Sequence, residues 1–389
     1  MPITESLPGP IVRIDGREYL YFVGTGYLGL QGHPEVIRAA CEAAQRYGIH
    51  SATSRAGFGN TPPTLLVESR AAEFFGAESA FYFPAGYASN NILLRAVEND
   101  FDALFLDEHS HYCVVDAALH SGRPTFRFRH RDARGLADLL QTHVKPRQRP
   151  LVMTDGVFSV RGTIAPLAEY LSVLSRYPGA GILIDDAHGV GVLGSRGRGT
   201  LEHFGLFDGS VNSEVSATPT AGEQAAAHKD EPCRLFLCAT LSKALGGYGG
   251  IIPGSRRLIE HVQKASHWFD GATAPPAPVT AASARALELI QADPGLLARL
   301  RSNVRRMKDG LRAMGFDVDD TPVPILCLVV GDAANMQRLQ QELMRRGIVV
   351  AYIAAYSGLG IEGGLRLAVF ATHTDDMISR FLDELRQVA

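Results

Sequence analysis

Over the middle of the chain, from about residue 64 to residue 251, short apolar runs alternate with amphipathic stretches. The runs have the length of buried strands, and the stretches repeat apolar residues at the spacing of one helix face. This alternation predicts an α/β fold whose mainly parallel sheet is covered by helices. In such sheets ligands bind beyond the carboxyl ends of the strands, so residues that directly follow the runs are the first candidates for chemistry. The runs are SAFYF (79–83), DALFLD (102–107), PLVMTD (150–155), GILIDD (181–186) and RLFLCA (234–239), and the helical stretches are 64–75 and 166–177.

The pattern changes after residue 275, where long helical stretches replace the regular alternation. A smaller α/β lobe with its own strands and a final helix is the expected result. The segment 213–232, rich in small and polar residues, is typical of an exposed loop inserted into the larger part. The expected parts are an N-terminal segment (1–47) that packs with the small lobe, a large domain (48–275) and a small C-terminal domain (276–389), with helices at 281–291, 297–314 and 335–347, an apolar run at 322–330 and a strand at 365–370.

The composition is typical of a globular protein, with 46% hydrophobic and 20% charged residues in a chain of 389. A net charge of −3 gives no electrostatic reason to expect a nucleic-acid or membrane partner. The N-terminus lacks a signal-peptide pattern and no segment has the unbroken apolar length of a membrane span, so we expect a cytoplasmic protein. Five scattered cysteines without the paired spacing of a zinc site predict neither disulfides nor a metal centre.

Two local patterns have competing interpretations. The run GVGVLG (189–194) matches the glycine spacing of a dinucleotide site, but no apolar helix opens directly after it, so we disfavour a dinucleotide function. The basic run FRFRHRDAR (126–134) alternates like a strand with one charged face. A solvated face is the simpler interpretation, and a contact with an anionic substrate tail is the alternative.

An acid follows one of the strand-like runs directly, in ILIDDAHG (182–189). A carboxylate at the mouth of a sheet needs a cationic partner to offset its desolvation, and a protonated pyridine nitrogen would serve. Asp185 is this acid, and His188, three residues further on, could lie on the same side of a turn. By itself the spacing is weak and a capped turn is the simpler interpretation, so its significance depends on the residues that accompany it.

The segment CATLSKALGGYGG (238–250) contains a lysine that can accompany Asp185 and His188 in one site. Lys243 is either a solvated turn residue or an amine whose charge is suppressed so that it can attack a carbonyl. Thr240 and Ser242 offer hydroxyls for a phosphate, and Gly86 and Tyr87 begin a helical stretch where free backbone N–H groups can bind an anion. A phosphate, a pyridine ring and an aldehyde would satisfy all of these groups together, which describes pyridoxal 5′-phosphate.

The motifs also occur in a familiar order. AGYASN (85–90) is followed by TDGVFSVRGTIAPL (154–167), DDAHGVGVLG (185–194) and TLSKALGGYGG (240–250). In this the chain resembles the α-oxoamine synthase family, fold-type I pyridoxal-phosphate enzymes of the class II aminotransferase group. The resemblance runs from GYLGLQGHPEVI (26–37) to LRLAVFATHT (365–374). It implies a fold-type I transferase with a large cofactor-binding domain, a smaller C-terminal domain and a homodimer whose active sites lie at the subunit interface.

The resemblance also assigns roles to the ring-binding residues. By position in the motifs, Lys243 is the Schiff-base lysine, Asp185 the partner of the ring nitrogen and His188 a donor to the phenolic oxygen. His111, in DEHSHYC, falls where the family stacks a histidine on the ring; without the match, His109 would be an equal candidate. These four matched residues, Lys243, His111, Asp185 and His188, are the expected catalytic residues.

Further residues receive binding roles from the same comparison of motifs. Ser159 matches a serine near the phenolic oxygen, and Arg366 in GLRLAVF matches the arginine that grips the substrate carboxylate. The expected cofactor ligands are Gly86, Tyr87, His111, Ser159, Asp185, His188, Thr240, Lys243 and, across a dimer interface, Thr273, while the expected substrate ligands are Arg366, Thr25 and Arg55.

The family reaction implied for this chain is the decarboxylative condensation of an α-amino acid with an acyl thioester, on coenzyme A or an acyl carrier, to give an α-amino ketone. An aminotransferase, an aldolase or lyase on the same fold, and a cofactor-free regulatory subunit are the alternatives. Several positions depart from the family pattern and leave the amino acid and the acyl donor open. They are Gly24-Thr25 in place of Ser-Asn, Arg161 in place of an acid, AAYSGLGIEGG (354–364) in place of a Pro-Pro-Thr segment, and the insertion at 213–232. For Arg161, a salt bridge and a contact with an acidic substrate group are both compatible with the sequence.

Overall fold

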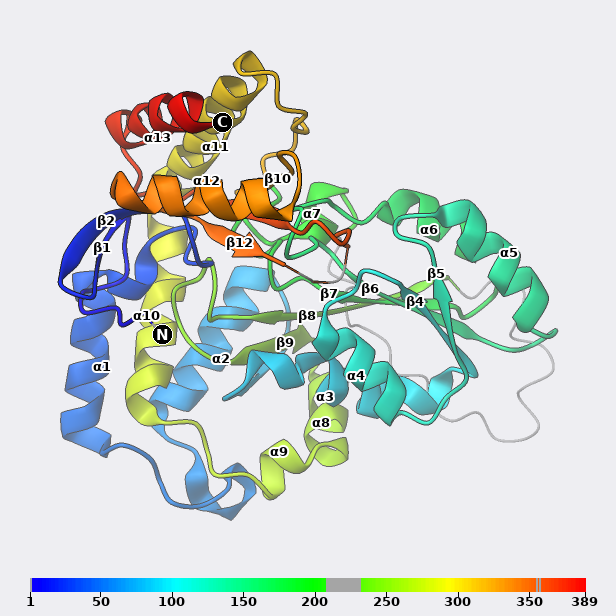
Figure 1. Cartoon of the computed structure of the whole chain (residues 1–389). Helices are drawn as coiled ribbons and strands as arrows, with labels where there is room; N and C mark the ends of the chain where they lie inside the picture. The colour runs from blue at the N-terminus through cyan, green and yellow to red at the C-terminus, as the bar shows by residue number, and fades with distance from the viewer. Residues whose placement is uncertain (1, 208–231, 355, 357) are drawn as a thin grey trace, which may run out of the picture.

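A computed structural model describes residues 2–207, 232–354, 356 and 358–389. Its large domain is built on a seven-stranded sheet with strand order β3-β9-β8-β7-β6-β4-β5. All neighbouring strands from β8 to β5 are parallel, and β9 alone runs antiparallel to both of its neighbours. The predicted mainly parallel α/β sheet is thus confirmed (Figure 1). The strands are β3 (Ser79–Phe83), β4 (Ala103–Asp107), β5 (Thr125–Phe128), β6 (Pro150–Asp155), β7 (Gly181–Asp185), β8 (Arg234–Thr240) and β9 (Gly250–Gly254).

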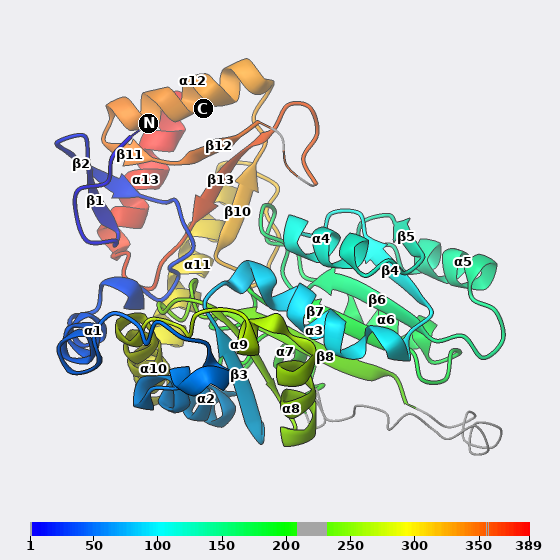
Figure 2. The same cartoon turned by 90° about the horizontal axis from the view of Figure 1, so that it is seen from below.

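Helices cover both faces of this sheet, as Figure 2 shows. Side chains of β6 alternate between the faces: Leu151 and Met153 belong to a core with α3, α4 and α8, and Val152 belongs to a core with α2, α5 and α6. Both faces are therefore dry, which explains the almost uninterrupted apolar runs in the sequence. The helices are α1 (Pro34–Tyr47), α2 (Pro62–Phe75), α3 (Ser89–Val97), α4 (Tyr112–His120), α5 (Ala133–His143), α6 (Leu167–Leu174), α7 (Thr200–His203), α8 (Arg256–Ala265), α9 (His267–Asp270) and α10 (Ala277–Ala292).

The small lobe holds two three-stranded sheets. One has the order β10-β13-β12 and is antiparallel; in the other, β2 pairs with β1 and, in parallel, with β11. The N-terminal strands thus pair with the C-terminal part of the chain, and the two lie together in Figure 1. The elements are β1 (Ile11–Ile14), β2 (Arg17–Tyr21), β10 (Ile325–Leu328), β11 (Ile348–Val349), β12 (Ala351–Ile353), β13 (Gly364–Ala368), α11 (Gly295–Ala313), α12 (Ala333–Arg345) and α13 (Asp375–Val388).

The structure differs from the sequence-based expectation at a few segments. The basic run 126–134 is a strand only as far as Phe128; Arg131 has a φ of 57° and α5 begins at Ala133, so the alternating charges do not form one strand face. The apolar run 322–330 forms a strand over only four residues, Ile325–Leu328. Apart from residue 232, the expected insertion 213–232 lies outside the described residues. Of the part of the chain that the structure describes, no helix is both long and apolar enough to cross a membrane.

His373 links the N-terminal strand to the small lobe in a site that fits only a neutral ring. Its Nδ1 accepts a hydrogen bond from the backbone N of Phe370 at 2.9 Å, and its Nε2 donates to the carbonyl of Tyr21 at 3.0 Å. The ring is stacked between Phe22 and Phe370 and is buried. Burial lowers its pKa from 6.5 to about 4, because the charged ring would be removed from water. A proton on Nδ1 would also face the N–H of Phe370, which is a donor and cannot accept it.

This site makes stability depend on pH. Above pH 6.5 the ring is neutral in both states, so its full contribution is present; as the pH falls from about 6.5 to about 4, the unfolded chain takes up the proton first. The expected loss of unfolding free energy from this group is on the order of 3 kcal/mol. We expect His373→Gln to flatten the decline between these pH values in denaturant unfolding, and the exposed His120→Gln to leave it unchanged. Parallel curves for wild type and His373→Gln would contradict this account.

Candidate active site

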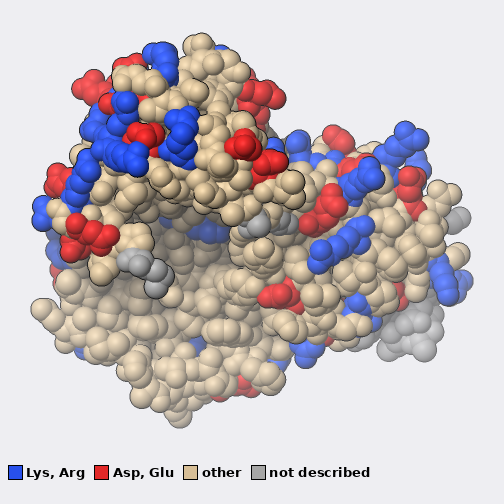
Figure 3. Space-filling model, in the orientation of Figure 1, with Lys and Arg blue, Asp and Glu red and all other residues tan. Residues whose placement is uncertain are grey.

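A cavity of ≈ 250 Å³ lies beyond the carboxyl ends of β7 and β8, where the small lobe meets the large sheet. The space-filling view is hollowed between these two parts (Figure 3). Parallel register brings Asp155 at the end of β6 beside Asp185 at the end of β7, and Asp185 beside Cys238 in β8. The cavity is lined by Gly86, Tyr87, His111, Cys113, Asp155, Asp185, Ala187, His188, Thr240, Ser242 and Lys243.

The carboxylate of Asp185 is buried and held by three neutral donors. Its Oδ2 accepts from the side-chain amide of Asn90 at 2.6 Å and from the thiol of Cys113 at 3.2 Å, and its Oδ1 accepts from the backbone N of Ala187 at 3.0 Å. Within the described residues it forms no ion pair. An ionised carboxylate in this position is therefore orientated but not neutralised, and it favours a cationic group inside the cavity.

Lys243 follows β8 and is directed into the same cavity. Its Nζ lies 3.0 Å from Nε2 of His188, and Nδ1 of His188 lies 2.8 Å from the hydroxyl of Tyr27. Burial lowers the pKa of Lys243, which the negative charge of Asp185 opposes, and burial together with the positive charge of Arg366 holds the pKa of His188 well below its usual value. Since the amine has no acidic hydrogen-bond partner in the described residues, the site favours an uncharged nucleophile over an ammonium ion.

His111 caps the start of α4 and lies on another wall of the cavity. Its backbone N donates to Asp155 at 2.8 Å, and its Nδ1 accepts from the backbone N of Cys113 at 3.2 Å. The ring packs near Tyr87 and Tyr356, and burial lowers its pKa. His109, the alternative from the sequence, instead stacks on His130 with ring centres 4.2 Å apart and does not line the cavity. The structure therefore brings His111, rather than His109, to the other site residues.

The opposite end of the cavity is suited to an anion. Thr240 donates from Oγ1 to the carbonyl of Gly249 at 2.8 Å and accepts from the backbone N of Ser242 at 3.1 Å. A Cβ added at Gly86 would lie 2.5 Å from Oγ1 of Thr240, so only glycine permits this approach. Gly86 and Tyr87 precede α3, whose first turn directs backbone N–H groups outward.

Arg366 lies on β13 and connects three parts of the chain. Its Nε donates to the carbonyl of Ser159 at 2.8 Å, and its two terminal nitrogens lie 3.3 Å from the carbonyl of Gly24 and 3.5 Å from the hydroxyl of Tyr27. The side chain is buried, and none of these partners is an acid. A buried guanidinium held only by neutral oxygens retains its full positive charge for an incoming carboxylate.

Other predicted ligands do not line the cavity. The carbonyl of Thr25 accepts from the backbone N of Tyr27, and Ser159 contributes its carbonyl to Arg366. Thr273 forms an isolated β-bridge with Ser54 on a surface segment. Thr25 and Ser159 therefore lie around Arg366, next to the cavity, while Thr273 lies apart from it within one chain.

The guanidinium of Arg55 is buried and paired with other groups of the protein. Its guanidinium forms a two-pronged ion pair with Glu68 and donates to Asn60 at 2.8 Å and to the carbonyl of Tyr82 at 3.2 Å. Only 4% of the residue is exposed. Within this chain the ion pair ties the 55–60 segment to α2 and β3, and the substrate contact of Arg55 stays a prediction.

Arg161 is engaged by the small lobe. Its Nε donates to the carbonyl of Gly358 at 2.9 Å, and it forms no ion pair with any described acid. The side chain thus bridges the loop after β6 and the segment that departs from the family's Pro-Pro-Thr pattern. The salt bridge expected as one alternative is thus not formed within the described residues, and the contact with an acidic substrate group stays a prediction.

Sequence reasoning missed four side chains that shape the cavity. Tyr27 lay in the GYLGL motif but received no role, and Asn90, the last residue of AGYASN, received none either. Cys113, two residues after His111, and Asp155, the acid of TDGVFS, follow strand-like runs and so satisfied the general criterion for candidates. Their specific contacts join segments far apart in the chain, which no local pattern reveals.

The cavity residues together suit pyridoxal phosphate. A free amine at Lys243 can bond to an aldehyde, the carboxylate of Asp185 can stabilise a protonated ring nitrogen, and the Gly86 and Thr240 end can accept a phosphate. The approach at Gly86 leaves space that any larger side chain would fill. Within the described residues, no cluster of acids, histidines or cysteines could hold a metal ion.

Known proteins resemble the chain over almost its full length. The profile of the family "Aminotransferase class I and II" matches residues 24–385. An 8-amino-7-oxononanoate synthase from Methylococcus capsulatus is 36% identical over 98% of this chain and 92% of its own length. Among solved structures, serine palmitoyltransferase from Sphingomonas wittichii superposes with a TM-score of 0.87 at 26% identity, covering 100% of this chain and 91% of its own.

A second solved structure concerns the cofactor. A serine palmitoyltransferase variant from S. paucimobilis, with pyridoxal phosphate and myriocin bound, has a TM-score of 0.87 at 25% identity and covers 100% of this chain and 92% of its own. The fold class expected from the sequence is confirmed by these superpositions. The chain belongs to the class I and II aminotransferase family and, within it, to the pyridoxal-phosphate-dependent α-oxoamine synthases whose motifs its sequence carries.

Proposed function

We propose that this enzyme condenses an α-amino acid with an acyl thioester, releasing carbon dioxide and a thiol and forming an α-amino ketone. The observation that carries the proposal is the partly buried amine of Lys243, whose pKa is lowered by desolvation, in a cavity that also contains the Asp185 carboxylate. The related synthase is named for a product with an amine next to a ketone, and serine palmitoyltransferase is named for the transfer of an acyl group to an amino acid. Both names describe this type of reaction.

Pyridoxal phosphate supplies an electron sink for the negative charge that develops at the α-carbon of the amino acid. In our proposal Lys243 Nζ would hold the aldehyde carbon of the cofactor and would serve as the base for the α-proton of the amino acid. Asp185 holds the proton of the ring nitrogen. His188 donates to the phenolic oxygen, and Ser159 lies near that oxygen. Gly86, Tyr87 and Thr240 bind the phosphate.

Two further residues act on the substrates in this scheme. Arg366 binds the carboxylate of the amino acid, for which its planar fork is suited. Because Nδ1 of His111 accepts a backbone hydrogen bond, the neutral ring carries its hydrogen on Nε2, which has no partner among the described residues. We propose that this Nε2–H donates to the acyl carbonyl while the ring face covers the cofactor.

We also propose a cytoplasmic homodimer that completes the site, with the domain boundaries 1–47, 48–275 and 276–389. Support for the dimer comes from one surface. Phe58 is 99% exposed and Ile49 is 65% exposed, and their segment pairs with Thr273 through Ser54. Exposed apolar side chains grouped in this way are typical of an interface. Thr25 and Arg55 then bind substrate only indirectly, through the segments that they hold.

The condensation itself can be tested with purified protein, single amino acids and acyl thioesters. We expect release of carbon dioxide and free thiol in equal amounts, and a loss of at least about 10³-fold in kcat for Lys243→Ala, since the base is removed. Lys264→Ala serves as the control and should retain activity, because Lys264 is exposed on α8 and does not line the cavity. Keto-acid formation without consumption of the thioester would instead indicate an aminotransferase.

The anion-binding end can be tested by adding one methyl group. In Gly86→Ala the new Cβ would lie 2.5 Å from Oγ1 and 2.8 Å from Cβ of Thr240, so the two segments must separate. Overpacking of about 1–3 kcal/mol corresponds to a roughly 5- to 150-fold rise in Kd for pyridoxal phosphate, measured by absorbance titration. Gly9→Ala, whose Cβ would meet nothing closer than 3.9 Å, should bind normally. Unchanged affinity in Gly86→Ala would remove Gly86 from the phosphate site.

The dimer can be tested at Phe58, whose φ of 68° an aspartate tolerates. We expect the wild type to sediment as a dimer, and Phe58→Asp to shift it toward monomer and weaken cofactor binding, because a charge would be buried at the interface. Leu119→Asp, which places the same charge at another exposed apolar position (64% exposed), is the control. A monomeric wild type that binds the cofactor fully would contradict the proposal.

A further inference from the structure

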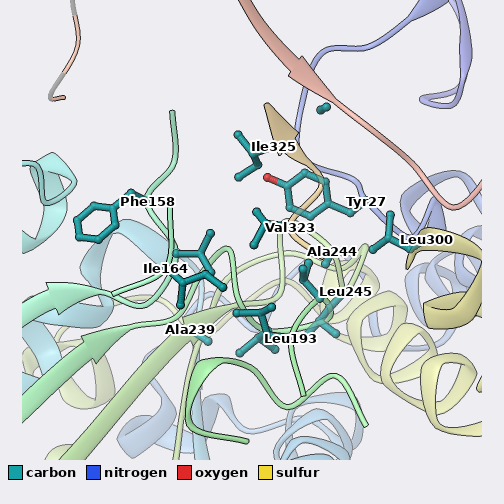
Figure 4. Close-up of a cluster of buried hydrophobic side chains, with 14 of the residues drawn as sticks. Tyr27, Phe158, Ile164, Leu193, Ala239, Ala244, Leu245, Leu300, Val323 and Ile325 are labelled. Atoms are coloured by element: carbon teal, nitrogen blue, oxygen red, sulfur yellow. The ribbon is translucent and has the colours of Figure 1, made fainter. Parts of the chain in front are cut away.

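Four side chains form one continuous line from the small lobe to the reactive amine: three are buried, and Lys243, the last, is partly buried. A terminal nitrogen of Arg366 lies 3.5 Å from the hydroxyl of Tyr27, that hydroxyl lies 2.8 Å from Nδ1 of His188, and Nε2 of His188 lies 3.0 Å from Nζ of Lys243. Figure 4 shows Tyr27 within a cluster of buried apolar side chains that includes Leu300, Val323 and Ile325. With Tyr27 fully buried and His188 only 4% exposed, solvent has little access to this line.

The donor and acceptor capacities of these groups give the line a direction. A guanidinium has only hydrogens to offer, so the Tyr27 oxygen accepts from Arg366. Burial raises the pKa of Tyr27 to about 12 even though the charge of Arg366 opposes the rise, so the phenol keeps its own hydrogen. That hydrogen is directed to the remaining close partner, Nδ1 of His188. Nδ1 is therefore the acceptor and bears no hydrogen.

The direction continues through the imidazole to the lysine. His188 is neutral, because burial and the positive charge of Arg366 both disfavour a second proton. With Nδ1 bare, the single ring hydrogen is on Nε2 and points to Nζ of Lys243. The amine must then accept with its lone pair, which only an uncharged amine can do. The opposite orientation would place a hydrogen on Nδ1 and leave Nε2 facing Lys243 as an acceptor of an ammonium hydrogen.

We propose that Tyr27 is a positioning residue that fixes the tautomer of His188, so that the ring presents Nε2–H to the reactive centre. In the enzyme without cofactor this hydrogen is donated to the Lys243 amine; with pyridoxal phosphate bound it is available to the phenolic oxygen. The inference rests on the proposed function only for this second partner, since the tautomer follows from the protein groups alone. The hydroxyl of Tyr27 thereby acts on the reaction through His188 and touches no reacting atom.

The tautomer can be measured directly by nitrogen NMR of full-length protein labelled in its histidines, both with pyridoxal phosphate and after its removal. His188→Gln identifies the signals by their loss. We expect Nδ1 of His188 to give the shift of a bare ring nitrogen and Nε2 that of a protonated one, in both forms. A hydrogen on Nδ1, or on both nitrogens, would overturn the proposal. This measurement on the wild type decides the question even if a variant fails to fold.

Variants then test whether Tyr27 is the cause. Tyr27→Phe keeps the ring and removes the hydroxyl, and we expect the His188 signals to move toward a mixture of tautomers. The rate of pyridoxal-phosphate attachment to Lys243, followed by absorbance, should fall about fivefold, the equivalent of one neutral hydrogen bond. Tyr170→Phe is the matched control, because its buried hydroxyl bonds to Asp107 away from the cavity. An unshifted tautomer in Tyr27→Phe would overturn the role of Tyr27.

The outcomes separate this inference from the proposed function. If the predicted tautomer is found but no thioester is consumed, the positioning role of Tyr27 stands and the condensation fails. If condensation occurs but the tautomer is reversed, the role of Tyr27 fails and the condensation stands. Arg366→Met provides a further check, because without the guanidinium the Tyr27 hydroxyl is free to turn, and we expect the His188 signals to show the mixture again.

Discussion

The desolvation of one lysine is the constraint on which the rest of this site depends. An exposed lysine keeps its proton at neutral pH, and an ammonium ion cannot attack a carbonyl. Lys243 is partly buried and contacts an imidazole instead of an acid, and desolvation lowers the pKa of its amine. The carboxylate of Asp185 opposes this effect, which is why it must stay oriented by Asn90 and Cys113 rather than pair with the amine.

The sheet and the small lobe each contribute different groups to the surroundings of Lys243. Parallel strands end at one edge and deliver Asp155 and Asp185 in register, with the Lys243 loop beside them. A sheet edge alone is open to water, so the low-polarity surroundings come from the covering segments. Tyr27, from the loop after β2, and Arg366, from β13, close the site from the small lobe. In the proposed function, cofactor chemistry and substrate recognition are thus supplied by different parts of the chain.

Much of the fold and part of the site could be predicted because their signals are local. The strand-like run 181–186 differs from β7 by one residue, since a strand buried on both faces has an apolar composition that sequence reveals. Lys243, Asp185 and His188 follow strands, so topology alone places them at one edge. Tyr27 could not be recognised in this way, because its function comes from a partner 161 residues away. The ion pair of Arg55 with Glu68 could not be predicted either, because a motif does not reveal a neighbour from another helix.

The departures from the family pattern follow the same division. Arg161 and Gly358 meet between the large domain and the small lobe, and Thr25 lies in the loop that also carries Tyr27. None of the three lines the cavity, whose ring-binding residues are the ones that match the family. A change of amino acid or acyl donor requires a different surface at the entrance, but the same charge balance around Lys243, because every substrate of this chemistry passes through that amine. A change of substrate within one reaction type would therefore alter residues around the entrance and leave the cavity residues unchanged, which is the pattern found here.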